Sequence, residues 1–157
     1  MAIELQQVKA IKDWRAYHAI RRHVLWELRG LDGYDDRHAD EHKPAHIPLL
    51  LRKDGLAVGT VRLDLSNDRT GVVRLVAIRR DYQRQGLGRI LMCEVEKLAA
   101  KHGLCRLELH AAPDAVPFYE KLGWAMIDAD RSDPLLAKAI QSPAHDAGSG
   151  DGWRSPL

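Results

Sequence analysis

The sequence predicts a mixed α/β fold in which helices cover the faces of one sheet. Three apolar runs separated by turn sequences, over residues 47–51, 56–65 and 72–78, predict three consecutive strands that pair as an antiparallel meander. A helical pattern precedes this meander, and helical and strand patterns alternate after it. Helices between strands on both sides of a meander indicate a mixed sheet with helices on its faces.

The composition is that of one ordinary globular domain. The chain has 157 residues, of which 45% are hydrophobic and 29% charged, and a chain of this length can bury one core. A net charge of +2 is too small to indicate nucleic acid. No run approaches the roughly eighteen apolar residues that span a membrane, and the first residues do not resemble a signal peptide. We therefore expect a cytoplasmic protein with no nucleic-acid or membrane partner.

The N-terminal part supplies a strand, a helix and a polar loop ahead of the meander. Weak alternation over residues 3–8 predicts the first strand. Apolar residues at three- and four-residue steps over 17–28 predict a helix that Gly30 ends. Residues 32–46 are rich in Asp, Glu and His and indicate a loop with at most a short helix. The Asp-Gly pair at 54–55 predicts the first hairpin turn of the meander.

Five further elements follow the meander, at residues 86–101 (helix), 104–109 (strand), 113–122 (helix), 124–127 (strand) and 135–140 (strand). The strand over 72–78 is nearly all apolar, so we expect it to be central and buried. Cys93 and Cys105 match no zinc spacing and are interpreted as small buried residues in a reducing compartment. Residues 141–157 hold little that can be buried, which predicts a domain over 1–140 and a disordered tail.

The glycine-rich turn between the last meander strand and the next helix, residues 83–89, points to function. The first amides of a helix lack partners within the helix and carry partial positive charge, so they can bind an anionic phosphate. Gly86 and Gly88 let the backbone approach a ligand closely. Arg84 and Arg89 add charge and forked donors. The turn therefore predicts a phosphate site.

Two other phosphate-binding motifs fit this turn poorly. A dinucleotide fold needs G-x-G-x-x-G after its first strand, whereas Leu91 occupies the third glycine position here and the turn follows a meander. The pattern G-x-x-x-x-G-K-[ST] is absent. A nucleotide-binding protein of another class is kept as a weaker alternative.

Two blocks together resemble the GNAT superfamily of acetyltransferases. Gln83-x-x-Gly86-x-Gly88 matches the motif Q/R-x-x-G-x-G/A, and residues 111–124 resemble the segment A-x-x-x-A-x-x-F-Y-x-K-x-G-F. The resemblance covers about residues 3–128. It implies a central, mostly antiparallel twisted sheet of six to seven strands, flanked by helices on both faces, with a V-shaped splay between two central strands.

The resemblance also implies an N-acetyltransferase that uses acetyl-coenzyme A, with direct attack by the amine, no covalent enzyme intermediate and no metal. Backbone groups of the strand would hold the acetyl carbonyl and the pantetheine arm, and the turn amides would hold the pyrophosphate. The implied coenzyme-binding residues are Val76, Ala77, Ile78, Gln83, Arg84, Gln85, Gly86, Leu87, Gly88 and Arg89. Tyr119 would act as the acid that protonates the leaving thiolate.

The base that takes the proton of the amine is left open. Arg74 stands where many family members carry a glutamate base. Glu27, Asp64 and His110 are candidates at the acceptor side, and His110 is the best because histidine titrates near neutral pH. Each also fits an exposed or structural role, and water is a further candidate. The missing glutamate keeps an alternative function open, a non-catalytic acyl-coenzyme A sensor or regulatory module.

The acceptor is not identified by the sequence, and a small-molecule or peptide amine both fit. His38 and His42 are four residues apart, but the loop character of 32–46 favours a solvated loop over a metal site. In the family this region lines the acceptor site, so its acidic side chains would attract a cationic amine. Dimers are common in the family, so the resemblance allows a homodimer.

Overall fold

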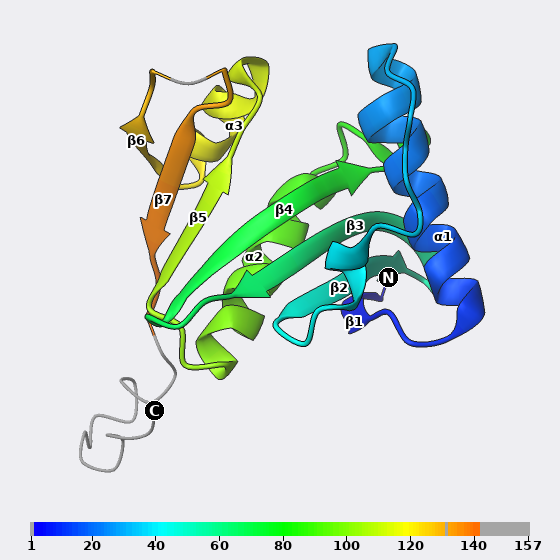
Figure 1. Ribbon diagram of the computed structural model, residues 1–157, viewed down its shortest axis with the longest axis horizontal. Coiled ribbons are helices and arrows are strands. Elements are labelled where there is room, and N and C mark those ends of the chain that lie inside the picture. Colours follow the sequence, from blue (N-terminus) through cyan, green and yellow to red (C-terminus); the bar gives the residue numbers. More distant parts are fainter. Residues whose placement is uncertain (1, 131, 142–157) are drawn as a thin grey trace. The chain divides into compact units, whose positions relative to one another are not determined.

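The strands of the structure, a computed structural model that describes residues 2–130 and 132–141, form a seven-stranded sheet in the order β1-β2-β3-β4-β5-β7-β6 (Figure 1). They are β1 Ile3–Gln7, β2 His46–Lys53, β3 Leu56–Leu65, β4 Thr70–Ile78, β5 Arg106–His110, β6 Ala125–Asp128 and β7 Leu135–Ala139. β4 and β5 pair in parallel, whereas β1 with β2, β2 with β3, β5 with β7 and β6 with β7 pair antiparallel. The predicted mixed, mostly antiparallel sheet is confirmed.

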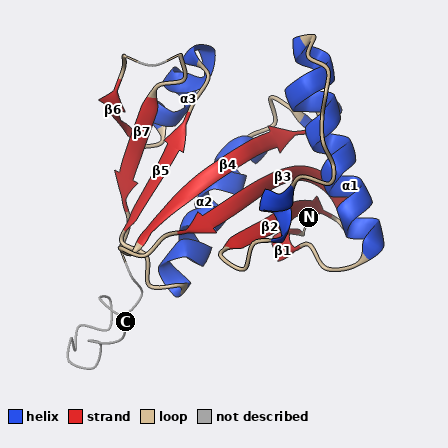
Figure 2. Ribbon diagram, viewed as in Figure 1, coloured by secondary structure: helices blue, strands red, loops and turns tan. Residues whose placement is uncertain are grey.

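The helices also follow the predicted order (Figure 2). They are α1 Ile11–Arg21, η1 Arg22–Trp26, η2 Glu27–Arg29, η3 Ala39–His42, η4 Arg80–Tyr82, α2 Leu87–Lys101, η5 Pro113–Ala115 and α3 Val116–Lys121. The first helical stretch ends at Gly30, which has the left-handed φ of 72° that favours glycine after a helix. α2 buries the stripe of Leu91, Val95 and Ala99 and is followed by Gly103 at φ 77°. Apolar periodicity therefore located α2 closely, whereas it placed the start of the first helical stretch near residue 17 and α1 begins at Ile11.

The described residues fall into two compact units. The first unit combines the residues up to Asp64 with Val73–Val95, and the second combines Leu65–Val72 with the residues from Glu96 onward. The pairing of β4 with β5 covers Thr70–Val72 of the second unit. The domain limits of 1–140 and the V-shaped splay stay predictions, and the predicted tail lies outside the described residues except for Gln141.

Two expectations about burial were wrong. Cys93 and Cys105 are exposed, because Cys93 lies off the buried stripe of α2 and Cys105 lies just before β5. Strand β4 is central, but only part of it is buried, since Arg74 is exposed and Val76 is partly exposed. An apolar run fixes the strand but does not say how many of its faces are covered.

Strand β4 pairs with β3 through an irregular segment. The amide of Arg79 donates to the carbonyl of Val58 at 2.8 Å, and the hydroxyl of Thr60 donates to the carbonyl of Leu75 at 3.4 Å. The two contacts run in opposite sequence order, as antiparallel strands require. Leu75 has a φ of 56°, a left-handed conformation that is rare for a bulky residue within a strand. Its neighbours in β3 and β4 therefore hold the strand in a strained shape.

A buried carboxylate joins α1 and η3 to β3. Glu41 is 3% exposed and accepts hydrogen bonds from the guanidinium of Arg21 and from the hydroxyl of Tyr17, the latter at 3.2 Å. Nη1 of Arg62 lies 3.6 Å from the carboxylate Oε1, and both arginine side chains are 5% exposed. Burial raises the pKa of Tyr17, so its hydroxyl stays a donor. These contacts fasten the polar segment after α1 to the sheet.

We expect Gly59→Ala to lower the free energy of unfolding by about 1–3 kcal/mol, as overpacking of a core does. An ideal Cβ at Gly59 would lie 2.8 Å from Cδ1 of Ile78 and 3.1 Å from the carbonyl oxygen of Ala77. Ile78→Val removes Cδ1, so the double variant should lose less than the sum of the two single losses. Denaturant unfolding of the four proteins measures this coupling. Strictly additive losses would show that the new Cβ does not meet Ile78.

We expect Glu41→Gln to lower the free energy of unfolding by about 3–5 kcal/mol, because it leaves the buried charge of Arg21 without its carboxylate. Asp36→Asn is the exposed control, since Oδ2 of Asp36 lies 3.4 Å from Nη2 of Arg22 and the two side chains are 49% and 42% exposed. That variant should lose less than about 1 kcal/mol. Similar losses in the two variants would contradict a special role for the buried carboxylate.

Candidate functional site

The turn between β4 and α2 presents backbone amides. After η4 the chain passes through Arg84 at φ 63° and Gly86 at φ 82° before α2 begins at Leu87. The amide of Ile90 donates to the carbonyl of Gly86 at 3.2 Å. In the described part of the chain, no amide from residue 84 to 89 donates to a backbone carbonyl outside α2. These amides are therefore available to an anion at the helix start.

Side chains hold the turn in place and leave its surface cationic. Nε2 of Gln83 donates to the carbonyl of Ile78 at 2.9 Å, which ties the turn to the end of β4. Leu87 is buried at 3% exposure and anchors the first residue of α2. Arg84 and Arg89 are exposed and form no ion pair with another described residue. Two exposed cations thus flank the amides of the turn.

The predicted strand residues differ in burial. Ala77 is 3% exposed and belongs to the core of the first unit, whereas Val76 and Ile78 are partly exposed. Leu75, directly before them, holds the left-handed φ of 56°. Backbone strain of this kind costs about 1–3 kcal/mol and concentrates at functional sites. The sequence contains no signal for it, because leucine is among the residues least suited to that conformation.

Asp64 lies among basic side chains. Nε and Nη2 of Arg62 donate to its two oxygens at 2.7 and 2.9 Å, Nε of Arg74 donates to Oδ2 at 2.9 Å, and Nε2 of His46 lies 3.4 Å from Oδ2. Burial lowers the pKa of Arg62, but its hydrogen bond to Asp64 and the nearby carboxylates raise that pKa by more. The contacts favour a structural role for Asp64. Reasoning from sequence missed Arg62, although alternation of Arg62 and Asp64 within an apolar strand is visible.

The other two acceptor-side candidates lie in different units. Glu27, in η2 of the first unit, is exposed and lies 3.1 Å from Nδ1 of His23. His110 ends β5 in the second unit, is exposed and is paired in register with Leu135. Their part in function stays a prediction.

Tyr119 is buried on α3 of the second unit. It is 7% exposed, and its ring packs edge-on against Trp124 at a centroid distance of 6.0 Å. Burial raises the pKa of Tyr119 to about 12. Within the described residues its hydroxyl makes no hydrogen bond. The phenol is therefore protonated at neutral pH and has a proton to donate.

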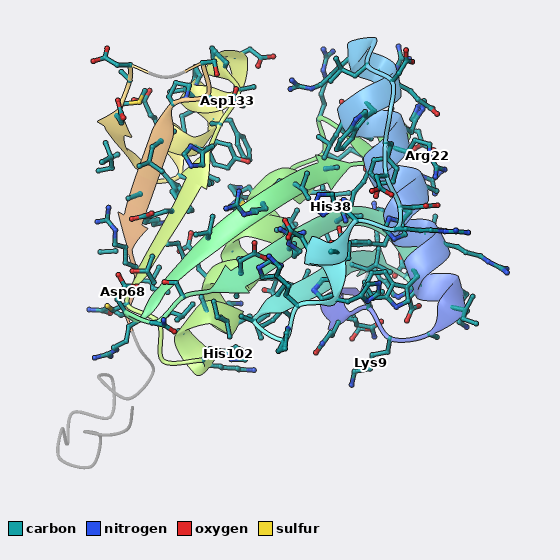
Figure 3. All side chains as sticks on the ribbon, in the orientation of Figure 1. Lys9, Arg22, His38, Asp68, His102 and Asp133 are labelled. Atoms are coloured by element: carbon teal, nitrogen blue, oxygen red, sulfur yellow. The ribbon has the colours of Figure 1, made fainter. Side chains whose placement is uncertain are left out.

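The loop rich in histidine and acids is largely self-paired. Asp40 accepts from Nζ of Lys43 at 2.9 Å, and this hydrogen bond lowers the pKa of Asp40. Nδ1 of His38 accepts from the amide of Asp40 at 3.1 Å (Figure 3), and the ring of His42 lies 5.1 Å from that of Trp14. Glu41 is buried, but Asp32, Asp35 and Asp36 of the same loop are exposed, so an attraction for a cationic amine stays a prediction.

The first unit also contains a cavity of about 760 Å³, a size typical of small-molecule sites. It is lined by Ala16, Ala19, Ile20, His23, Val24, Leu56, Ala57, Arg79, Arg80 and Asp81. Its lining residues from α1 and β3 are apolar, whereas Arg79, Arg80 and Asp81, which follow β4, are charged. The cavity thus lies next to the segment that leads into the glycine-rich turn.

Comparison with known proteins agrees with the fold. A protein of Bacillus subtilis described as an acetyltransferase is 26% identical over 129 residues, which is 78% of this chain and 83% of that protein. A spermidine N(1)-acetyltransferase of Thermoplasma acidophilum is 29% identical over 57% of this chain and 56% of its own. The crystal structure of an N-acetyltransferase from Thermoplasma acidophilum in complex with coenzyme A superposes with a TM-score of 0.72 at 19% identity, over 89% of this chain and all of that one.

Across the described residues, no helix combines the length and the apolar character needed to cross a bilayer.

The profile of the acetyltransferase (GNAT) family matches residues 11–124, which is well over half of the chain. The protein therefore belongs to the GNAT family, a family of acyltransferases.

Proposed function

We propose that the protein transfers an acetyl group from acetyl-coenzyme A to the amine of a small molecule or peptide. Family membership supports acyl transfer in general. The observation that carries the coenzyme assignment is the set of amides over residues 84–89, which have no backbone acceptor outside α2 among the described residues. Amides at a helix start, next to exposed arginines, suit a pyrophosphate.

The strand before the turn would hold the reacting end of the coenzyme. Val76 and Ile78 are partly exposed on β4, so their backbone groups would bind the pantetheine arm and the acetyl carbonyl. Leu75 at φ 56° supports this assignment, because an irregular strand leaves backbone groups outside the regular ladder. An amide donor at Val76 would stabilise the oxyanion that forms on attack.

The chemistry balances without a covalent enzyme intermediate. The lone pair of the amine attacks the thioester carbonyl carbon and gives a tetrahedral oxyanion. Collapse of this oxyanion breaks the carbon–sulfur bond and releases the thiolate, which takes a proton from the hydroxyl of Tyr119. Water or His110 takes the proton that the amine loses. Asp64 is not assigned this role, since Arg62 and Arg74 already occupy its oxygens.

Calorimetry followed by an activity assay tests the proposal. Acetyl-coenzyme A should bind saturably to the full chain, and an amine panel should release free thiol in its presence. Binding without thiol release from any amine would favour the alternative function, a non-catalytic acyl-coenzyme A sensor. Absence of binding would remove both coenzyme functions.

Gly86→Ala should weaken acetyl-coenzyme A binding about 10-fold, because a Cβ at this position strains the turn and stands where the backbone approaches the ligand. Gly103→Ala is the matched control, since both glycines have a left-handed φ, 82° and 77°, and nothing within 4 Å of an added Cβ. Both variants should lose about 1 kcal/mol of unfolding free energy. If the calorimetric affinity for acetyl-coenzyme A changes equally in the two variants, Gly86 has no special role in binding the coenzyme.

Tyr119→Phe should lower kcat about 100-fold or more, because it removes the proton donor to the thiolate, and should leave the affinity for acetyl-coenzyme A unchanged. Since the pKa of Tyr119 is raised to about 12, the phenol keeps its proton throughout the neutral range, so the loss should be the same at every neutral pH. Thiol release and calorimetry on the same preparation measure both quantities. Unchanged turnover would exclude Tyr119 from the mechanism.

A further inference from the structure

We propose that Arg74 binds a carboxylate on the acceptor, so that the amine acylated by this enzyme belongs to a small molecule of amino-acid type. The inference rests on the proposed function for the amine and on the geometry of the first unit for the carboxylate. All residues that carry it, from α1, η3, β2, β3 and β4, belong to that unit.

The guanidinium of Arg74 is bound through its Nε, and its two Nη groups remain available to a ligand. Its Nε donates to Oδ2 of Asp64 at 2.9 Å, and its side chain is 46% exposed. Among the described residues, its two Nη groups donate no hydrogen bond. An arginine fixed through Nε keeps a planar pair of donors in a set orientation, which matches the two oxygens of a carboxylate.

Asp64 does not need Arg74 for neutralisation. Arg62 already donates to both oxygens of Asp64, at 2.7 and 2.9 Å, and is 5% exposed. A second guanidinium adds a positive charge that the pair does not require. A purely structural role therefore leaves the charge of Arg74 unexplained.

The charge count of the whole cluster places its surplus on Arg74. Three arginines (Arg21, Arg62 and Arg74) meet two carboxylates (Glu41 and Asp64), which leaves one positive charge before any protonation of His46. Arg21 and Arg62 are buried against the two acids, whereas Arg74 is half-exposed. An anion from solution can reach only this last member of the cluster.

The position of Arg74 on β4 places it near the proposed reaction site. Arg74 precedes Val76 by two residues, so their Cα atoms lie no more than about 7 Å apart. Under the proposed function the acyl group reacts next to Val76. One small molecule that carries both a carboxylate and an amine, such as a free α- or β-amino acid, would then reach both groups. Long polycationic amines, which bring only positive charge, would meet Arg74 unfavourably.

Product-type ligands test the carboxylate site without turnover. In the presence of coenzyme A, calorimetry compares N-acetylglycine, N-acetyl-L-alanine, N-acetyl-L-leucine and N-acetyl-β-alanine with their uncharged amides. At least one acid should bind the native protein about 10-fold or more tighter than its amide, as a charge-assisted pair of hydrogen bonds gives. Arg74→Gln should abolish this preference. Arg74→Lys, which keeps the charge but not the paired donors, should retain part of it.

Arg106→Gln is the matched control. Nε of Arg106 also donates to a carboxylate, Oε2 of Glu108 at 2.9 Å, and its side chain is 43% exposed. This variant should keep the full preference for the acid. Equal binding of every acid and its amide by the native protein, or a preference that survives in Arg74→Gln, would overturn the inference. A preference lost equally in Arg106→Gln would overturn it as well.

Thiol release separates this inference from the proposed function. The parent amino acids are assayed with acetyl-coenzyme A beside their amides and beside spermidine. If an acid binds tightly but no amine leads to thiol release, the carboxylate site is supported and the transferase activity is contradicted. If thiol is released as fast with the amides and spermidine as with the amino acids, the transferase activity is supported and the carboxylate site is contradicted.

Discussion

The burial of Glu41 is the constraint on which the first unit depends. A carboxylate that is 3% exposed is costly unless cations and donors meet it, and here they come from α1 through Arg21 and from β3 through Arg62. Arg62 also donates to both oxygens of Asp64, and Asp64 accepts from Arg74. One chain of contacts thus runs from the buried face of α1 to a half-exposed side chain on β4. The polar core fixes the orientation of that side chain.

The turn after β4 is a second constraint, carried by backbone rather than by side chains. Leu75 and Arg84 both have a left-handed φ, 56° and 63°, although neither is glycine, and such residues cost about 1–2 kcal/mol each. The burial of Ala77 between them and of Leu87 after them supplies compensating apolar contacts. This places strain and unpaired amides in one short segment, while the elements on both sides are well packed. Binding of an anion would then require little rearrangement of the turn.

The sequence predicted the features that depend on local pattern. Apolar periodicity located α2 to within a residue, and the Asp-Gly signal predicted a hairpin whose residues have φ of 50° and 86°. The sequence did not predict features that depend on contacts between residues far apart in the chain. The partners Glu41 and Arg62 lie in separate elements, so no spacing rule connects them. The left-handed Leu75 follows from how β3 and β4 fit together, and the exposure of Cys93 from which side of α2 is covered. The glycine motif predicted the turn because its cause, the helix start, is local.

The resemblance places a glutamate base at the position of Arg74, so the proposed reaction needs another way to remove the proton of the amine. A carboxylate base would remove the proton of an arriving ammonium, and the first unit offers none at this point of β4, since Asp64 is occupied by Arg62 and Arg74. A nearby guanidinium acts in another way, because a like charge disfavours the protonated form of an amine and lowers its pKa. The same residue that would hold the carboxylate of the acceptor would thus raise the fraction of neutral, nucleophilic amine. Under the proposed function, water would then accept the proton released after attack, and the reaction would need no glutamate at this position.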